Sequence, residues 1–155
     1  MGLFDFFTKR TLSKAEINSI LEREWHLQKP LIDQIVITEC EKLVNKEDLI
    51  IILESGLHKE FVSKILLDLF IDNFGYQLGA IHGLRADVVD VPMNRNTTII
   101  NSFKNKINAL NQNYPFKDSE MLKNCYEQIA MKVCTIGQER GKENYYLFKD
   151  TIIRK

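Results

Sequence analysis

Proline and glycine are scarce in this sequence of 155 residues, which contains three prolines and seven glycines. Flexible linkers and low-complexity segments are usually rich in these residues, so the composition excludes a long linker between domains. A chain of this length buries roughly 70% of its unfolded surface on folding, which is enough for one core. We therefore predict a single globular domain over residues 1–155.

Cysteine is also rare, and the spacing of Cys40, Cys125 and Cys134 fits neither a disulfide framework nor a metal site. All three stand among apolar residues, and we interpret them as small core side chains in a reducing compartment. The start of the chain lacks a basic leader followed by a long apolar region. Charged residues interrupt the most apolar segment before it reaches the roughly 20 residues of a membrane span. These absences favour a cytoplasmic protein.

Familiar catalytic patterns are missing as well. The three histidines, His26, His58 and His82, stand at no ligand spacing with one another or with a cysteine. No glycine-rich loop follows a predicted strand, and no serine lies in a nucleophile elbow. We therefore expect no metal, no cofactor and no enzymatic activity.

One pair of acids leaves a second function class open. Asp68 and Asp72 lie one helical turn apart, a spacing at which two carboxylates can hold Mg²⁺ or share a proton. The same spacing suits a solvated helix edge on which Lys64 pairs with Asp68. The alternative function is therefore a small helical enzyme, or a ligand- or metal-binding domain, that uses Asp68, Asp72 and His82.

What the sequence does contain is a long apolar segment, His58–Ala86. Its apolar residues recur at helical spacing over more than half of the circumference, which is typical of the central helix of an all-α fold. Gly75, Gly79 and Gly83 follow one another at four-residue spacing on the remaining stripe. They indicate close packing of a second helix or a homodimer contact, unless the helix ends at Phe74 with Gly75 as its C-cap.

The N-terminal half is expected to add three helices, for a total of about six or seven. Ser13 and Glu16 form a capping box that begins the first helix, which should end before Pro30. A second helix follows, with a strand as the alternative because of its β-branched residues. Asn45 is a suitable cap for a third, short helix that ends near Gly56.

The C-terminal half is expected to begin with a surface connection of about ten residues. A helix should start at Asn96 or Thr97, and another should run from Asp118 or Ser119 to Gly137. The tail beyond Gly137 is predicted as a last helix, with a strand as the alternative because of its low helix propensity.

The charges balance over the whole chain, which has 21 basic and 21 acidic residues, and we predict no nucleic-acid partner. The charges do not balance within each part of the chain. Residues 31–90 hold eleven acids and five bases, so the two flanks carry an excess of bases. We predict that eight of these acids form a surface for a basic protein partner. They are Glu39, Glu41, Glu47, Asp48, Asp68, Asp72, Asp87 and Asp90.

In size, helical content and lack of catalytic motifs, the chain resembles the small cytoplasmic immunity proteins of bacterial contact-dependent toxin systems. Members of that class neutralise toxin domains that are often nucleases. The resemblance implies an inhibitor that acts by direct protein contact. The charge pattern separately predicts that the acidic middle of the sequence faces a basic toxin domain.

Overall fold

Helices account for all of the regular structure in the computed structural model, which describes residues 13–82 and 92–153. They are α2 (Lys14–Glu41), α3 (Lys46–Glu54), α4 (Leu57–Glu60), the π-helix η1 (Phe61–Ile65), α5 (Leu66–His82), α6 (Pro92–Asn113) and α7 (Ser119–Ile153). The predicted all-α class is therefore confirmed, since these residues contain no strand.

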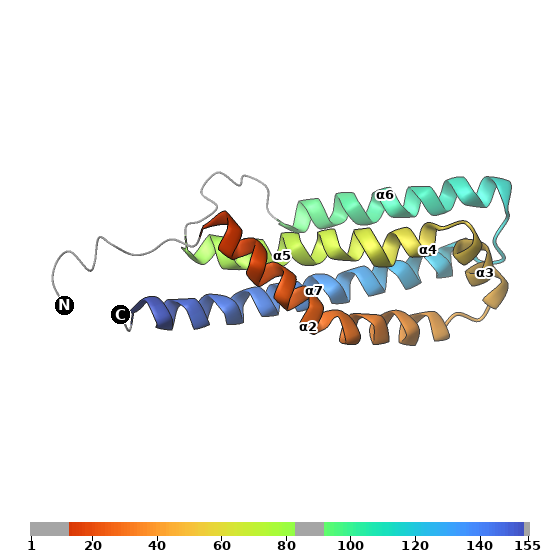
Figure 1. Cartoon of the computed structure of the whole chain (residues 1–155). Helices are drawn as coiled ribbons and strands as arrows, with labels where there is room; N and C mark the ends of the chain where they lie inside the picture. The colour runs from red at the N-terminus through yellow and green to blue at the C-terminus, as the bar shows by residue number, and fades with distance from the viewer. Residues whose placement is uncertain (1–12, 83–91, 154–155) are drawn as a thin grey trace.

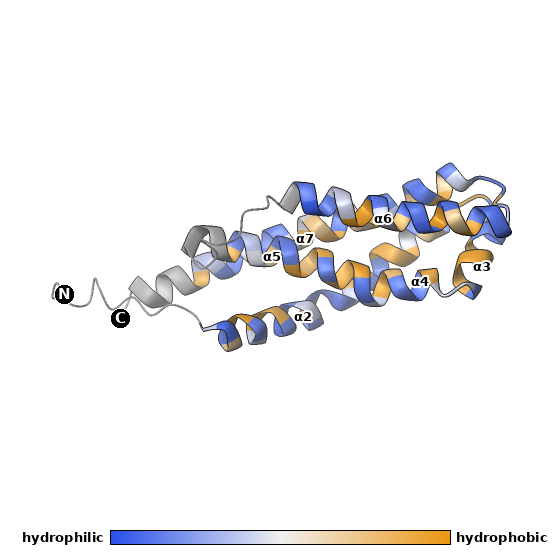
Figure 2. Cartoon of the chain, turned by 90° about the horizontal axis from the view of Figure 1, so that it is seen from above, coloured by the Kyte–Doolittle hydropathy of each residue, from blue (hydrophilic) through white to orange (hydrophobic). Residues whose placement is uncertain are grey.

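The long helices lie side by side in an elongated bundle (Figure 1). α4, η1 and α5 follow one another without a break and form one rod, which runs in the same direction as α7 and packs extensively against it. α2 and α6 run the opposite way and flank this pair, while α3 lies at the end of the bundle where α2 ends. Figure 2 shows that apolar residues concentrate along the middle of the bundle.

The rod of α4, η1 and α5 is the central element that the sequence predicted. Leu69, Phe70 and Phe74 have no exposed surface. Trp25 of α2 packs against Phe70 with 5.4 Å between ring centroids, and aromatic pairs of this kind add about 0.5–1.5 kcal/mol beyond burial. All three cysteines are buried, as their apolar neighbours indicated.

The described residues form five continuous helical segments, fewer than the six or seven helices predicted from the sequence. One reason is that α2 continues through Pro30. Proline has no amide proton for the carbonyl four residues earlier, so a helix break was the expected result. Pro30 is exposed, however, and the freed carbonyl can bond to water. Buried Ile32 and Val36 anchor the helix beyond it. The proline bends α2, which changes direction part-way along its length (Figure 1), and does not end it.

A helix was also predicted to end at Gly137, but α7 continues through this residue to Ile153. At Gly137 and Gly141, α7 lies so close to α5 that a β-carbon would not fit. An added β-carbon would stand 2.9 Å from the carbonyl oxygen of Phe70 at Gly137, and 2.6 Å from that of Phe74 at Gly141. These glycines therefore serve close helix packing, and the tail is a helix and not a strand.

A glycine contact was expected on the central helix, at Gly75, Gly79 and Gly83. α5 continues through Gly75 to His82, so the alternative in which Gly75 ends the helix is wrong. The close contact between α5 and α7 is made by the glycines of α7. Gly83 lies outside the described residues, and the packing around Gly79 is not described either. A homodimer through this stripe therefore stays a prediction.

The remaining helix ends follow local signals. Ser13 Oγ accepts from the Glu16 amide at 3.1 Å, and the Glu16 carboxylate accepts from the Ser13 amide, as in a capping box. Gly56 takes the left-handed conformation, with φ at 85°, after the end of α3. Asn45 precedes α3 but makes no side-chain capping bond. α6 starts at Pro92, earlier than predicted, because the first turn of a helix needs no amide proton there.

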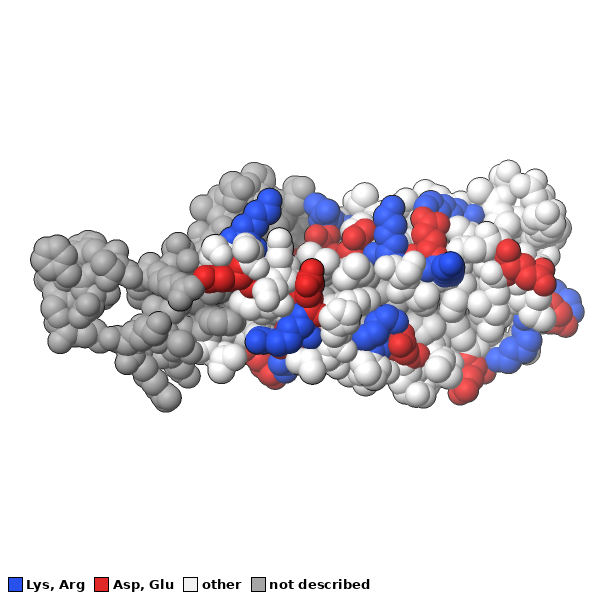
Figure 3. Space-filling view, viewed as in Figure 1, with Lys and Arg blue, Asp and Glu red and all other residues white. Residues whose placement is uncertain are grey.

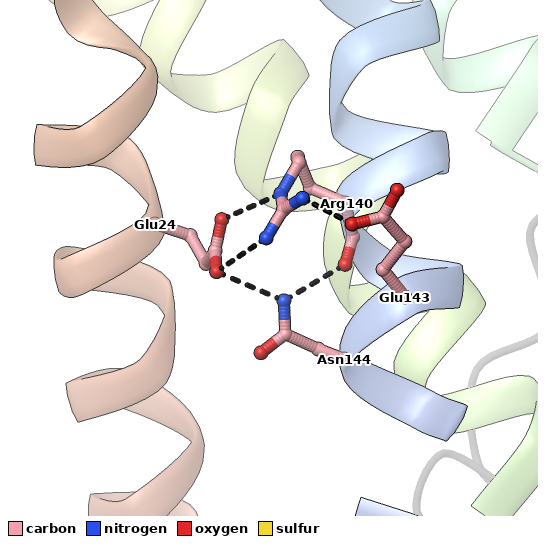
Figure 4. A network of polar contacts seen from close by, with 4 residues as sticks. All are labelled: Glu24, Arg140, Glu143 and Asn144. Atoms are coloured by element: carbon pink, nitrogen blue, oxygen red, sulfur yellow. Dashed lines mark hydrogen bonds and ion pairs between the residues drawn. The ribbon is translucent and has the colours of Figure 1, made fainter. Parts of the chain in front are cut away.

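A partly buried ion pair joins α2 to α7 (Figure 4). Arg140 donates from Nε to Glu24 Oε2 at 2.8 Å and from Nη2 to Glu24 Oε1 at 3.1 Å. Asn144 Nδ2 donates to Glu24 Oε1 at 3.0 Å, and Arg140 also pairs with exposed Glu143. Burial alone would raise the pKa of Glu24, but the hydrogen bonds from Arg140 and Asn144 and the charge of Arg140 outweigh it and lower that pKa.

Replacing Gly141 with alanine should lower the free energy of unfolding by about 1–3 kcal/mol, because the new methyl group collides with the backbone of Phe74. At an exposed helical position the same change would stabilise by up to about 1 kcal/mol. Urea unfolding checks the prediction, with Lys142→Ala at the neighbouring exposed position as the control. A more stable Gly141→Ala variant would contradict the close contact.

Replacing Glu24 with glutamine should cost roughly 1–3 kcal/mol at pH 7, because it leaves the guanidinium of Arg140 with a weaker partner. Glu143→Gln removes the exposed contact to Arg140 and should change stability by less than about 1 kcal/mol. Since the folded pKa of Glu24 is lowered, its contribution is full above the unfolded pKa and is lost as pH falls through the folded value. The difference between wild type and Glu24→Gln should therefore shrink in acid; a constant difference would refute this account.

Candidate functional site

Glu39, one of the acids predicted to bind a partner, lies in the interior of the protein. Its carboxylate accepts hydrogen bonds from Lys132 of α7 and from Lys42, the latter at 3.0 Å. These bonds lower the pKa of Glu39, Lys132 contributing most. The carboxylate thus links α2 to α7, and its assignment to a partner surface is corrected.

Asp48 is likewise buried, and it anchors α3 to the turn before α7. Its two carboxylate oxygens accept from the backbone amides of Lys117 at 2.8 Å and Asp118 at 3.0 Å. Asp118 in turn caps α7 by accepting from the Met121 amide. Asp48 satisfies amides that have no helical partner, so it too is removed from the predicted partner surface.

Three of the predicted acids, Glu41, Glu47 and Asp68, are exposed. Glu47 pairs with Lys117 at 3.0 Å, and Figure 3 shows acidic and basic side chains interspersed over the face it displays. Asp87 and Asp90 lie outside the described residues. The acidic middle of the sequence is therefore spread over several environments, and its role in binding stays a prediction.

Asp72, the last of these acids, pairs with Arg95 of α6 and not with Asp68. The guanidinium supplies the positive charge that a metal ion would supply at that carboxylate. Asp68 is exposed, and the side chain of His82 lies outside the described residues. Across residues 13–82 and 92–153, no three His, Cys, Asp or Glu side chains are grouped to hold a metal.

A pocket of about 290 Å³, lined by both polar and apolar side chains, lies between α6 and α7. Buried Asn73 and half-buried Asn96 donate to each other at 2.9 and 3.1 Å, and Gln138 donates to Asn73 at 3.0 Å. Cys134 also lines the pocket, and burial raises the pKa of its thiol to about 11. The thiol is therefore protonated at neutral pH and a poor nucleophile, while the amides mainly satisfy one another.

A second cavity is an apolar groove of about 360 Å³ where α2, α3 and α4 meet, which we call the α2–α3 groove. It is lined by Val36, Ile37, Cys40, Glu41, Lys46, Leu49, Leu53 and His58. Figure 3 shows a largely uncharged surface between α2 and α4 at this end of the molecule, with charged side chains at its margin.

Large apolar side chains stay exposed in and near the groove. Ile37 and Leu53, which line it, keep 50% and 48% of their surface exposed, and Ile50 of α3 keeps 52%. Val44, between α2 and α3, keeps 76%. Single exposed apolar residues are common, but several around one concave site mark an interaction surface.

Hydrogen bonds hold the polar side chains of the groove in place. His58 Nδ1 and the Tyr126 hydroxyl of α7 share a hydrogen bond of 2.7 Å. Burial lowers the pKa of His58 and raises that of Tyr126, so both are uncharged at neutral pH. Lys46 Nζ donates to the carbonyl oxygens of Cys40 and Glu41 at 3.1 and 2.9 Å, which caps the C-terminus of α2.

This groove was not predicted from the sequence, although the short helix α3 carried a signal for it. Residues 49–53 are five consecutive apolar residues, and a nine-residue helix has apolar side chains on every side when they are wound into it. Only Ile52 among them is fully buried. The sequence alone indicates that α3 has more apolar residues than the core can cover. It does not indicate which of them face outward.

In the part of the chain that the structure describes, none of the helices combines the length and the apolar character needed to cross a membrane.

Replacing His58 with glutamine should flatten the dependence of stability on pH between about pH 7 and pH 5. The pKa of His58 is lowered in the folded protein, so the unfolded chain binds the proton more readily below its own pKa of about 6.5. Wild type should lose stability as pH falls through this window, and His58→Gln should lose less. Denaturant unfolding at both pH values, with exposed His26→Gln as the control, checks this; equal slopes for wild type and His58→Gln would contradict it.

No protein-family model, no curated protein and no solved structure matches the chain.

Proposed function

We propose that the chain is a protein-binding inhibitor of the immunity type, which neutralises a toxin domain by direct contact. The observation that carries this proposal is the α2–α3 groove, with exposed Ile37, Leu53 and Ile50 in and beside it. A concave apolar site with charged Glu41 and Lys46 at its edge has the anatomy of a protein interface, with an apolar centre and polar groups at the rim. Such an inhibitor needs complementarity to its partner and no catalytic group of its own.

The exposed acids have a separate part in this proposal. Glu41 lines the groove, and Glu47 and Asp68 are exposed elsewhere. With Asp87 and Asp90, they would raise the association rate with a basic toxin domain by long-range attraction, which salt screens. The apolar groove would supply most of the binding free energy, since a few buried anchors dominate most interfaces.

A ligand-binding function at the pocket between α6 and α7 is the second candidate. It is favoured by the size of the pocket and by the amides of Asn96 and Gln138, which line it and are hydrogen-bonded to buried Asn73. Thermal-shift measurements with divalent metals and small polar ligands separate the two candidates, because a specific ligand at 100 times its dissociation constant adds about 2.7 kcal/mol.

The proposal is tested by purifying the tagged chain from its native host with its bound partner, and by assaying that partner alone and in a 1:1 mixture with the chain. The inhibitor should abolish the activity of the partner at equimolar ratio. Ile37→Asp in the groove should weaken inhibition about tenfold or more. Leu27→Asp, on an exposed site of α2 outside the groove, is the control and should inhibit like wild type. A partner with unchanged activity in the mixture would refute inhibition.

A further inference from the structure

One carboxylate at the α2–α3 groove has no ion-pair partner among the described residues. Apart from the buried thiol of Cys40, three residues that line the groove are ionisable: Glu41, Lys46 and His58. The ammonium group of Lys46 is engaged by two backbone carbonyls at the end of α2, and His58 is neutral against Tyr126. The carboxylate of Glu41 is exposed and makes no ion pair with any residue of the described ranges. An occupant of the groove therefore meets an apolar surface with two opposite charges at its edge. One is the ammonium group of Lys46, which is already hydrogen-bonded to the end of α2, and the other is the carboxylate of Glu41, which has no ion-pair partner among the described residues.

The size and walls of the groove limit the shape of the occupant. About 360 Å³ accommodates a few side chains and not a whole folded surface. Helices form the walls, and residues 13–82 and 92–153 offer no strand edge to which an extended peptide could add. Ile37 and Leu53, half exposed on α2 and α3, face a site where the apolar stripe of a third helix could pack between them.

We propose that the α2–α3 groove binds an amphipathic helix of the partner protein, with apolar side chains at three- and four-residue spacing on Ile37 and Leu53 and a lysine or arginine paired with Glu41. This inference rests on the proposed function and names the element that the partner presents. Helix-in-groove binding of this kind uses apolar anchors for affinity, while the pair at the edge fixes the orientation of the helix.

The test uses two synthetic helical peptides with the full-length protein. Both are fluorescein-labelled 15-residue amphipathic helices with leucine at positions i, i+3, i+4 and i+7, and they differ only in carrying lysines or glutamates beside the leucines. Fluorescence anisotropy should show binding of the lysine peptide, with the glutamate peptide weaker by about twofold to fivefold. Glu41→Lys should reverse that order. Ile37→Asp and Leu53→Asp should each weaken the lysine peptide about tenfold or more, whereas Leu27→Asp should not.

Other outcomes would overturn the proposal. If the lysine peptide does not bind, the groove is not a site for such a helix. If it binds but Ile37→Asp and Leu53→Asp leave its affinity unchanged, it binds elsewhere on the protein. Concentration-dependent dimerisation in analytical ultracentrifugation that Leu53→Asp abolishes would make a second copy the occupant. Tighter peptide binding after deletion of residues 1–12 would make that segment the occupant. Because these peptides need no toxin, a negative result here leaves the inhibition assay to decide the proposed function independently.

Discussion

Backbone-to-backbone contact between α5 and α7 sets the geometry on which the rest of the bundle depends. With glycine at positions 137 and 141, no side chain separates the two helices at Phe70 and Phe74. Two parallel helices that approach this closely leave a furrow on each side, and α2 and α6 pack along those sides. Aromatic rings of α2, α6 and α7 then pack on the central rod, as Trp25 does on Phe70 and Phe103 does on Phe61.

The sequence predicted those features that depend on neighbouring residues. The capping box at Ser13 and the left-handed turn at Gly56 each need only the backbone within four residues, and both are present. Pro30 and Gly137 carry the same kind of local signal, but there tertiary packing prevailed: buried side chains follow the proline, and a facing helix needs the glycine. Local propensity is a weak guide wherever packing energy is larger than about 1 kcal/mol.

The candidate site was harder to predict because its residues come from three helices. Whether an acid is buried depends on distant partners: Lys132 stands 93 residues from Glu39, and Asp118 stands 70 residues from Asp48. The charge count of residues 31–90 could not reveal these pairings. The groove also depends on tertiary packing, since α3 is too short to cover both the core and the outward side of α2.

The bend at Pro30 also divides α2 into two parts with different anchors. The part before it is fixed to α7 by Glu24 and Arg140, and the part after it carries Val36, Ile37 and Cys40 to the groove. The missing amide at Pro30 removes one link from the hydrogen-bond ladder between them, so one part can open without the other. We therefore expect the two halves of α2 to behave as separate cooperative units in native-state hydrogen exchange. Contact at the groove would then slow amide exchange in one half and leave the other at its intrinsic rate of opening.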